Sequence, residues 1–273
     1  MKKITKLITT LVLCVSCLCC SACFSLTPNS SKEDIDAVNG ITTQGIIQAT
    51  FAVYIQQYNP SILPGVEPTK STSLGSGVIY EAENKGTELE PLYEYKLLTN
   101  NHVVYHDKSQ YAKAEYVVQD CYGVKTDATL LCCDASYDLA VLTFTSSTLY
   151  PDLDFASLNP VEKTKVISIG YPLKQINAVT LGEVKEYSYV SVTASEQESN
   201  VKFKALKHTA PIAGGSSGGV VLTYDYKICG INFGAVEDEN KNFKLACSIP
   251  VYKVKEYLKT NKAISDEKLG TQA

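Results

Sequence analysis

The chain of 273 residues contains no arginine, so all 25 of its basic residues are lysines. Lysine lacks the planar guanidinium group that makes paired contacts with phosphate and with guanine. The formal charge is negative, at −4, and it becomes −7 when residues 1–22, with three lysines and no acidic residue, are removed. A chain of this charge and composition is not expected to bind nucleic acid.

The cysteines of the main part of the chain lack a metal-binding pattern. Of ten cysteines, five lie in or beside the N-terminal segment, and the five that remain include no pair of C-x-x-C motifs. Most of these lie in apolar runs, so we expect buried free thiols that pack as small hydrophobic residues, with a disulfide between Cys229 and Cys247 as the alternative. The sequence predicts no metal and no other cofactor. The five are Cys121, Cys132, Cys133, Cys229 and Cys247.

The N-terminal apolar run, residues 7–20, has 14 positions, whereas a membrane-spanning helix needs roughly 20. Lysines precede this run and small residues end it, which is typical of an export signal over residues 1–22. Cys20-Ser21-Ala22 fits the cleavage site of a secreted protein, whereas Ser21-Ala22-Cys23 resembles the end of a bacterial lipoprotein signal, although Cys20 replaces the usual leucine. We therefore predict an exported protein, either secreted or attached to the extracellular face of a bacterial membrane through a lipidated Cys23.

Composition divides the rest of the chain into a linker, a domain and a tail. Residues 23–40 are rich in Ser, Pro and charge and are expected to be a tether, residues 41–260 to be the domain, and residues 261–273 to be a polar tail. Within the domain, short runs rich in Val, Ile, Tyr and Thr are separated by turn residues and predict strands. These runs are 49–55, 75–80, 93–98, 115–118, 127–132, 139–144, 165–169, 178–184, 189–193, 201–205, 220–222, 227–233 and 243–249.

Two β units are expected, because the proline-bracketed segment 150–160 is poor in strand formers and separates two sets of strands. The first unit covers about residues 44–150 and the second about 160–250. Many short strands with little helical periodicity predict an all-β barrel or sandwich. Only residues 251–258 have apolar positions at helical spacing, so one C-terminal helix is expected, and no internal repeat is found.

Three polar residues with apolar neighbours have the chemistry of a serine hydrolase. A serine nucleophile needs an imidazole to take its proton and a carboxylate to orient the imidazole. Of only three histidines, His102 lies shortly after a predicted strand. Asp138 opens an apolar run, where burial requires a partner, and Ser217 lies in a Gly-Ser-Ser-Gly-Gly turn. We predict that they form a catalytic triad, whereas His106 and Asp134 have the contexts of a solvated loop and of a turn.

The glycines around Ser217 predict an oxyanion hole. A tight turn aims the backbone N–H groups of Gly215 and Ser217 at one point, where a carbonyl oxygen can become an anion. A flexible Gly/Ser surface loop is the alternative. The apolar flanks, residues 210–213 and 220–222, favour a fixed turn.

With these motifs in order, the chain resembles the trypsin-like serine proteases, and among them the bacterial HtrA/Deg branch, over about residues 46–258. The resemblance implies two six-stranded Greek-key β-barrels of the chymotrypsin type, with His102 and Asp138 on the first, Ser217 on the second and the active site between them. The matching segments are 75–79, 98–104, 138–142, 166–172, 215–219, 230–232 and 248–250.

The chain departs from the family pattern at three places. Ser216 stands where pancreatic-type enzymes have the aspartate that captures a new amino terminus, so that route of activation is not expected. Phe233 stands where the family usually has a small hydroxyl residue near the catalytic aspartate. Only 15 residues follow Leu258, too few for the PDZ domain that usually follows in HtrA-type proteases.

The same resemblance implies an aliphatic specificity pocket. By position, Pro211 and Ile212 would form its base and Ala246 its wall, and none of them is charged. Residues 233–235 (Phe233, Gly234 and Ala235) would pair with the substrate as an added strand. We therefore predict an endopeptidase that cleaves extended or unfolded polypeptide after small or medium aliphatic residues. A catalytically silent surface module that binds a peptide or host protein, and a general esterase, are the alternatives.

Overall fold

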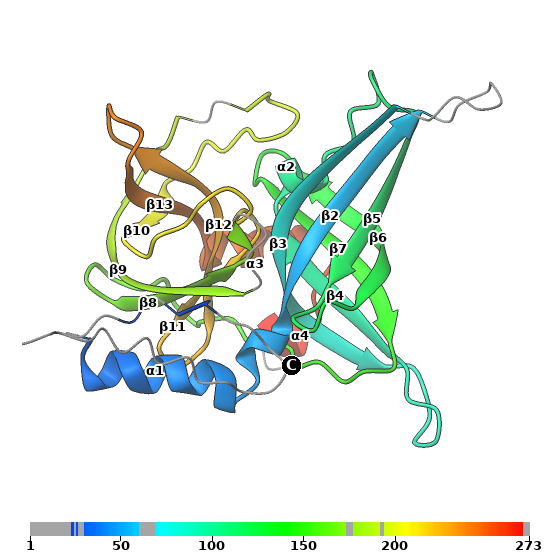
Figure 1. Cartoon of the computed structure of the whole chain (residues 1–273), viewed down its shortest axis with the longest axis horizontal. Helices are drawn as coiled ribbons and strands as arrows, with labels where there is room; N and C mark the ends of the chain where they lie inside the picture. The colour runs from blue at the N-terminus through cyan, green and yellow to red at the C-terminus, as the bar shows by residue number, and fades with distance from the viewer. Residues whose placement is uncertain are drawn as a thin grey trace, which may run out of the picture.

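The computed structural model describes residues 23–24, 26, 30–59, 69–172, 177–191 and 194–269. Two β-barrels lie side by side in this part of the chain, and a long N-terminal helix runs along the second of them (Figure 1). The export signal predicted for residues 1–22 lies outside the described residues.

The first barrel is built from six antiparallel strands closed in the order β2-β3-β4-β7-β6-β5. Side chains alternate between the inside and the outside of the barrel along each strand. In β6, exposed and half-buried residues alternate without interruption. The strands are β2 (Thr50–Asn59), β3 (Thr69–Asn84), β4 (Tyr93–Thr99), β5 (Lys113–Gln119), β6 (Lys125–Asp134) and β7 (Leu139–Ser146).

The second barrel repeats this arrangement in the order β8-β9-β10-β13-β12-β11, with β11 pairing back to β8. A two-residue strand, β1 (Cys23–Phe24), adds to β9 in parallel. The predicted all-β fold of two six-stranded barrels is therefore confirmed. The strands are β8 (Lys165–Gly170), β9 (Ala178–Ser188), β10 (Ala205–His208), β11 (Val220–Thr223), β12 (Ile228–Glu237) and β13 (Phe243–Pro250).

The prediction of a tether over residues 23–40 was wrong, because helix α1 (Lys32–Thr43) occupies the second half of this stretch. Ser31 and Asp34 form a capping box that begins the helix. The charged residues that suggested a solvated linker share this helix with Ala37 and Ile41, which are buried against the barrels. Asp34 also binds Lys165 at the start of β8, with 2.9 Å between Oδ1 and Nζ.

The other helices are short, apart from the predicted C-terminal one, which is α3 (Val251–Thr260). They are η1 (Ile46–Ala49), α2 (Asn101–Val104) and α4 (Asp266–Leu269). The last of these lies in the expected polar tail, which is packed rather than free: the Tyr80 hydroxyl donates to the carbonyl of buried Ala263, and Lys268 pairs with Asp152 and Asp154. None of the helices in the described ranges is long and apolar enough to span a bilayer.

Two strand predictions were wrong. Residues 189–191, with 194–204, form an irregular connection between β9 and β10, and β10 begins only at Ala205. A segment with strand propensity forms a strand only when it has a neighbouring strand to pair with. The described part of this connection bonds residues of the first barrel and pairs with no strand there. The consequence is a loop that reaches the neighbourhood of His102.

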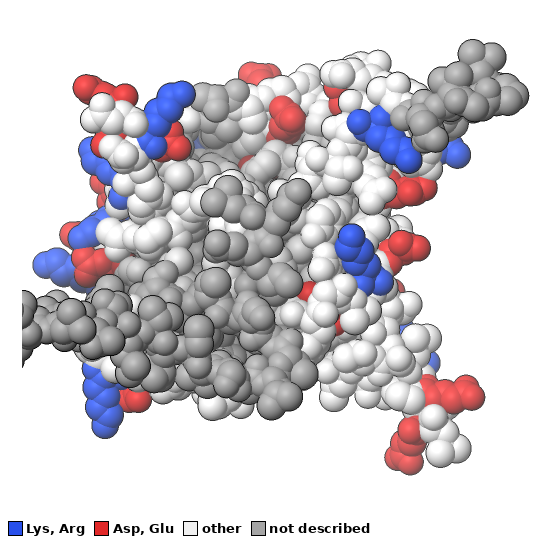
Figure 2. Space-filling model, in the orientation of Figure 1, with Lys and Arg blue, Asp and Glu red and all other residues white. Residues whose placement is uncertain are grey.

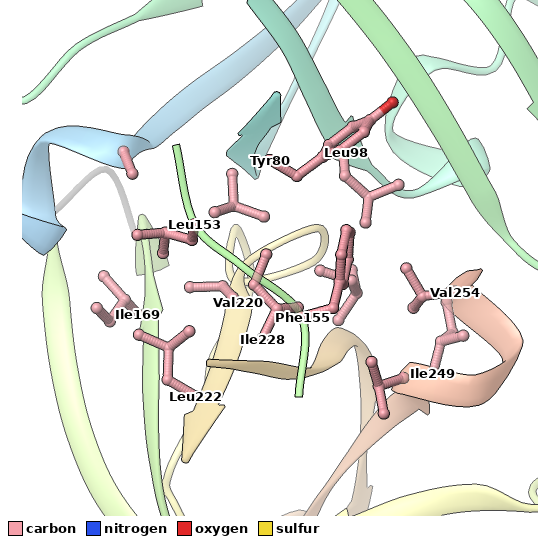
Figure 3. Packing of buried hydrophobic residues seen from close by; sticks show 14 of the residues in the cluster. Tyr80, Leu98, Leu153, Phe155, Ile169, Val220, Leu222, Ile228, Ile249 and Val254 are labelled. Atoms are coloured by element: carbon pink, nitrogen blue, oxygen red, sulfur yellow. The ribbon is translucent and has the colours of Figure 1, made fainter. Parts of the chain in front are cut away.

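A shared apolar core joins the two barrels (Figure 3). Tyr80 and Leu98 from the first barrel, Val220 from the second and Phe155 from the connecting segment belong to one buried cluster, which also includes Val254 of α3. Burying each such side chain fully contributes roughly 1.5–3 kcal/mol before entropic costs. Residues at the junction of the barrels are therefore held in fixed relative positions.

Lysine and acidic side chains are interspersed around the face seen in Figure 2. Cys229 and Cys247 form no disulfide, so this alternative is wrong. Cys121, Cys229 and Cys247 are buried as expected, whereas Cys133 is exposed.

Candidate active site

His102 and Asp138 form a hydrogen-bonded pair at one end of the first barrel. Thr99 of β4 lies opposite Ala140 of β7, so the residues just after β4 and just before β7 meet at that end. His102 Nδ1 lies 2.8 Å from Asp138 Oδ2 and 3.1 Å from Oδ1, and the His102 backbone N–H donates to Oδ1 at 3.0 Å. The Asp138 carboxylate is completely buried, so this pairing supplies the partner that its burial requires.

Backbone contacts fix the aspartate. Asp138 has a left-handed backbone (φ 52°), and the Asn100 side chain donates to its carbonyl at 2.8 Å. Asp134, the rival carboxylate, instead accepts the backbone N–H of Ser136 in the turn before Asp138. His106 bonds the Tyr111 carbonyl within its own loop. Neither rival belongs to the His102–Asp138 pair.

Ser199 is a further member of this cluster, which the sequence did not reveal. Its hydroxyl donates to Asp138 Oδ2 at 3.0 Å, and its side chain is only 4% exposed. Ser199 lies in the connection between β9 and β10, which was predicted to contain strands. No local motif marks it, because its partner lies 61 residues away in the sequence.

The turn that carries Ser217 contains two residues with left-handed backbones, Gly215 (φ 98°) and Gly218 (φ 81°). Within it, the Ser216 N–H donates to the Ala213 carbonyl and the Gly219 N–H to the Ser216 carbonyl. The N–H groups of Gly215 and Ser217 donate to no acceptor in the described ranges. Two unpaired amides, separated by one residue, are therefore available to bind an oxyanion.

Ser76 of β3 holds this turn from the first barrel. Its backbone N–H donates to the Ser217 carbonyl at 2.7 Å, and its hydroxyl donates to the Gly215 carbonyl at 2.7 Å. The Tyr171 N–H in turn donates to the Ser76 hydroxyl at 2.9 Å. The peptide units beside both free amides are therefore clamped, without an aspartate at position 216.

The segments that carry Ser217 and His102 meet at Gly75, at the junction of the barrels. A Cβ atom at Gly75 would come within 2.6 Å of Val103, next to His102, and within 2.9 Å of the Ser217 carbonyl oxygen. Ser217 is half-buried as a residue, and its hydroxyl forms no hydrogen bond with His102 in this structure. Contacts of this kind often tighten only when substrate binds.

A cavity of about 260 Å³ opens beside the histidine–aspartate pair. Phe233, Gly234 and Ala235, which were predicted to pair with the substrate, belong to its lining, whereas the predicted pocket residues Pro211, Ile212 and Ala246 do not. Ala246 is fully buried in β13, and the Pro211 carbonyl accepts from Thr180. The complete lining is His102, Asp138, Val190, Ser191, Ala194, Ser199, Phe233, Gly234, Ala235 and Cys247.

The thiol of Cys247, which also lines this cavity, is chemically able to act as a nucleophile, but it is protonated at neutral pH. Burial raises the pKa of the Cys247 thiol to about 11. Because the thiolate is the reactive form, Cys247 does not compete with Ser217.

A larger and mainly polar groove, of about 950 Å³, borders the other side of His102. It lies between the β2–β3 hairpin, the segment 105–111 and the tip of the β9–β10 connection. His102 therefore borders two hollows, an arrangement that suits an extended chain passing across it. No cluster of three or more side chains suited to a metal occurs in the described ranges.

His208 lies in a buried polar network within the second barrel. Its Nε2 is 3.1 Å from Asn232 Oδ1 and 3.0 Å from Ser248 Oγ, and Asn232 also donates to Ser168. Its Nδ1 is buried without a hydrogen-bond partner. Burial lowers the pKa of His208 to about 4, so the ring is neutral at pH 7.

Two six-stranded barrels, with a histidine–aspartate pair on one and a glycine-rich serine turn on the other, define a protein of the chymotrypsin fold. The family model described as "Trypsin-like peptidase domain" matches residues 75–231, and the chain belongs to this family. The sequence resemblance to the HtrA branch is supported by the Bacillus subtilis relative described next.

The serine protease Do-like HtrA of Bacillus subtilis (strain 168) is 32% identical over 178 residues, which are 64% of this chain and 36% of that protein. The chain thus spans little more than a third of this relative. Among solved structures, the HtrA-type protease AlgW with decapeptide has a TM-score of 0.61 at 21% identity, covering 83% of this chain and 67% of that one. The serine endoprotease from Yersinia pestis has a TM-score of 0.57 at 22% identity, covering 86% and 68%.

Proposed function

We propose that this protein is a serine endopeptidase that cleaves extended or unfolded polypeptide through an acyl-enzyme. The observation that carries the proposal is the contact of His102 with the buried Asp138, at 2.8 Å, together with a serine turn that has two unpaired amides. Family membership and the HtrA-type relatives support the same reaction class.

In this mechanism, His102 Nε2 takes the proton of Ser217 as its hydroxyl attacks the peptide carbonyl. Asp138 holds Nδ1 and stabilises the imidazolium that forms. The Gly215 and Ser217 amides bind the developing oxyanion, and His102 then protonates the leaving amine. In the second half of the reaction, His102 takes a proton from water, which attacks the acyl group on Ser217 and releases it.

The substrate is proposed to bind as a strand along β12. Strand β11 pairs with β12 only as far as Ile231, whereas β13 continues alongside it to Glu237. Phe233 and Ala235 therefore lie where the described chain leaves one edge of β12 free, beside the cavity. Backbone pairing of this kind reads extended chains with little regard to sequence, which suits unfolded polypeptide.

Cleavage is proposed to follow small or medium aliphatic residues, because Pro211, Ile212 and Ala246, at the family's pocket positions, are uncharged. A charged substrate side chain enclosed by these residues would lack a charged partner among them. A peptide library should give Ala, Val, Ile or Leu at the cleaved position. A profile dominated by Lys or Glu contradicts this.

The protein is further proposed to act outside the cytoplasm, either secreted or anchored through a lipidated Cys23. The basic and apolar start of the sequence supports this. Mass spectrometry of the mature N-terminus in a bacterial host distinguishes a diacylglyceryl Cys23 from an unmodified end, and an uncleaved Met1 contradicts export by either route.

The test of the catalytic function is labelling of Ser217 by a fluorophosphonate, together with release of peptides from an unfolded protein. Replacing Ser217 with Ala should abolish labelling and reduce turnover by on the order of a millionfold, and Asp138→Asn by roughly ten-thousandfold. An unlabelled wild type that still binds peptide supports the silent binding module, and ester hydrolysis without peptide cleavage supports an esterase.

A further inference from the structure

We propose that Ser199 is a positioning residue for the catalytic centre: its hydroxyl holds the Asp138 carboxylate in the orientation that presents Oδ2 to His102. This inference rests on the proposed function and adds a residue to its mechanism. It assigns the role to a side chain from the second barrel, although Asp138 and His102 both belong to the first.

The hydrogen bonds of the carboxylate divide between its two oxygens. Oδ1 accepts the His102 backbone N–H at 3.0 Å, and Oδ2 accepts from His102 Nδ1 at 2.8 Å and from Ser199 at 3.0 Å. Among the described residues, Ser199 is the one donor to this carboxylate outside His102. Without it, a completely buried charge keeps only donors that belong to a single residue.

No other described side chain donates to this carboxylate in the structure. Phe233 lines the same cavity but carries no donor. A carboxylate held only on the His102 side can rotate about its terminal torsion, which is broad for aspartate. Rotation would lengthen the 2.8 Å contact with Nδ1, on which the orientation of the imidazole depends.

Ser199 is itself fixed by the segments that carry the pair. The Asn101 side chain, next to His102, donates to the carbonyls of Gln197 at 2.9 Å and Glu198 at 2.8 Å. The Asn200 N–H donates to the Ala135 carbonyl, in the turn before Asp138, at 2.8 Å. The loop therefore presents the hydroxyl at a defined place rather than by chance contact.

Replacing Ser199 with Ala should lower kcat by roughly ten- to a hundredfold while KM stays within about twofold, the range expected for losing one hydrogen bond to a charged group. Ser188→Ala is the matched control, because the Ser188 hydroxyl, at the end of β9, donates to its neighbour Glu186 and to no other described residue. This control should retain wild-type kcat.

A double-mutant cycle separates positioning from general loss of structure. If Ser199 acts through Asp138, Ser199→Ala should change kcat little once Asp138 is already Ala. Equal losses in both backgrounds, or a wild-type kcat for Ser199→Ala in a folded protein, overturn the proposal.

A second readout does not need activity. In the Ser217→Ala protein, the low-field proton NMR signal of His102 Nδ1–H should shift when Ser199 is also replaced by Ala, and an unmoved signal contradicts the contact. If wild-type protein hydrolyses no peptide, the proposed function fails and the catalytic role of Ser199 fails with it. The NMR signal then still reports whether Ser199 orients the pair.

Discussion

At the scale of single residues, His208 links stability to pH. Its pKa is about 4 in the folded protein because burial disfavours the imidazolium, whereas an unfolded histidine titrates near 6.5. Between these values the unfolded chain binds more protons, so the free energy of unfolding falls as pH falls from about 6.5 to 4. The loss over this window is on the order of 3 kcal/mol, at about 1.4 kcal/mol for each pH unit.

Urea unfolding of the Ser217→Ala protein at several pH values between 6.5 and 4.5 tests this coupling. Replacing His208 with Gln should make the free energy of unfolding less dependent on pH, because the titrating ring is gone. His106→Gln is the control, since His106 lies in a partly exposed loop. Identical pH slopes for the two variants contradict the prediction.

The candidate catalytic residues were predictable one by one because each has a distinctive local context. His102 follows a strand, Asp138 opens one, and Ser217 lies among glycines. Ser199 has no such context, since its identity depends on a contact across the two barrels. Nor does the sequence indicate that Ser76 clamps the serine turn.

At the scale of elements, strands with a partner on each side were predicted well and the β9–β10 connection was not. Runs such as 139–144 and 243–249 alternate or are continuously apolar, and they lie within β7 and β13. Residues 189–193 have the same composition, but the described part of this run forms no strand. The composition of a segment indicates its strand propensity, whereas the rest of the fold determines whether the segment has a neighbouring strand to pair with.

Helix α1 is an integral part of the domain, and this can be measured. Ile41 is completely buried, so Ile41→Ala should lower the free energy of unfolding by roughly 2–5 kcal/mol. Lys32→Ala at the exposed start of the helix should change it by less than about 0.5 kcal/mol. Chemical unfolding curves of the Ser217→Ala protein compare the two. Equal stability for Ile41→Ala and its parent would mean that this stretch acts as a tether after all.

At the scale of the whole molecule, the two barrels share one strand order although the sequence shows no repeat. Closing each sheet on itself requires only alternating side chains and suitable turns, which many sequences satisfy. The fold class was therefore accessible from the strand pattern and the motifs. The distance between Ser217 and His102 was not, because it depends on how the barrels pack.

Gly75 lies where the packing of the two barrels affects the candidate site. Its missing side chain lets Val103, next to His102, and the Ser217 carbonyl approach the same atom. A methyl group there would meet backbone oxygen at 2.9 Å and valine carbons at 2.6 Å, too close for either. Gly75→Ala should therefore move the serine turn away from His102 and lower kcat by about a hundredfold or more, since displacements near 1 Å have such effects.

The matched change is Gly214→Ala, because a Cβ atom at Gly214 would meet no atom within 4 Å. Both variants place the same methyl group near the serine turn, and only Gly75→Ala crowds the junction of the barrels. Fluorophosphonate labelling rates and unfolding curves should show a large loss of reactivity for Gly75→Ala in a folded protein and a clearly smaller one for Gly214→Ala. Equal reactivity of the two would mean that the barrels adjust freely around the site, and the catalytic geometry would then have to be set by substrate binding instead.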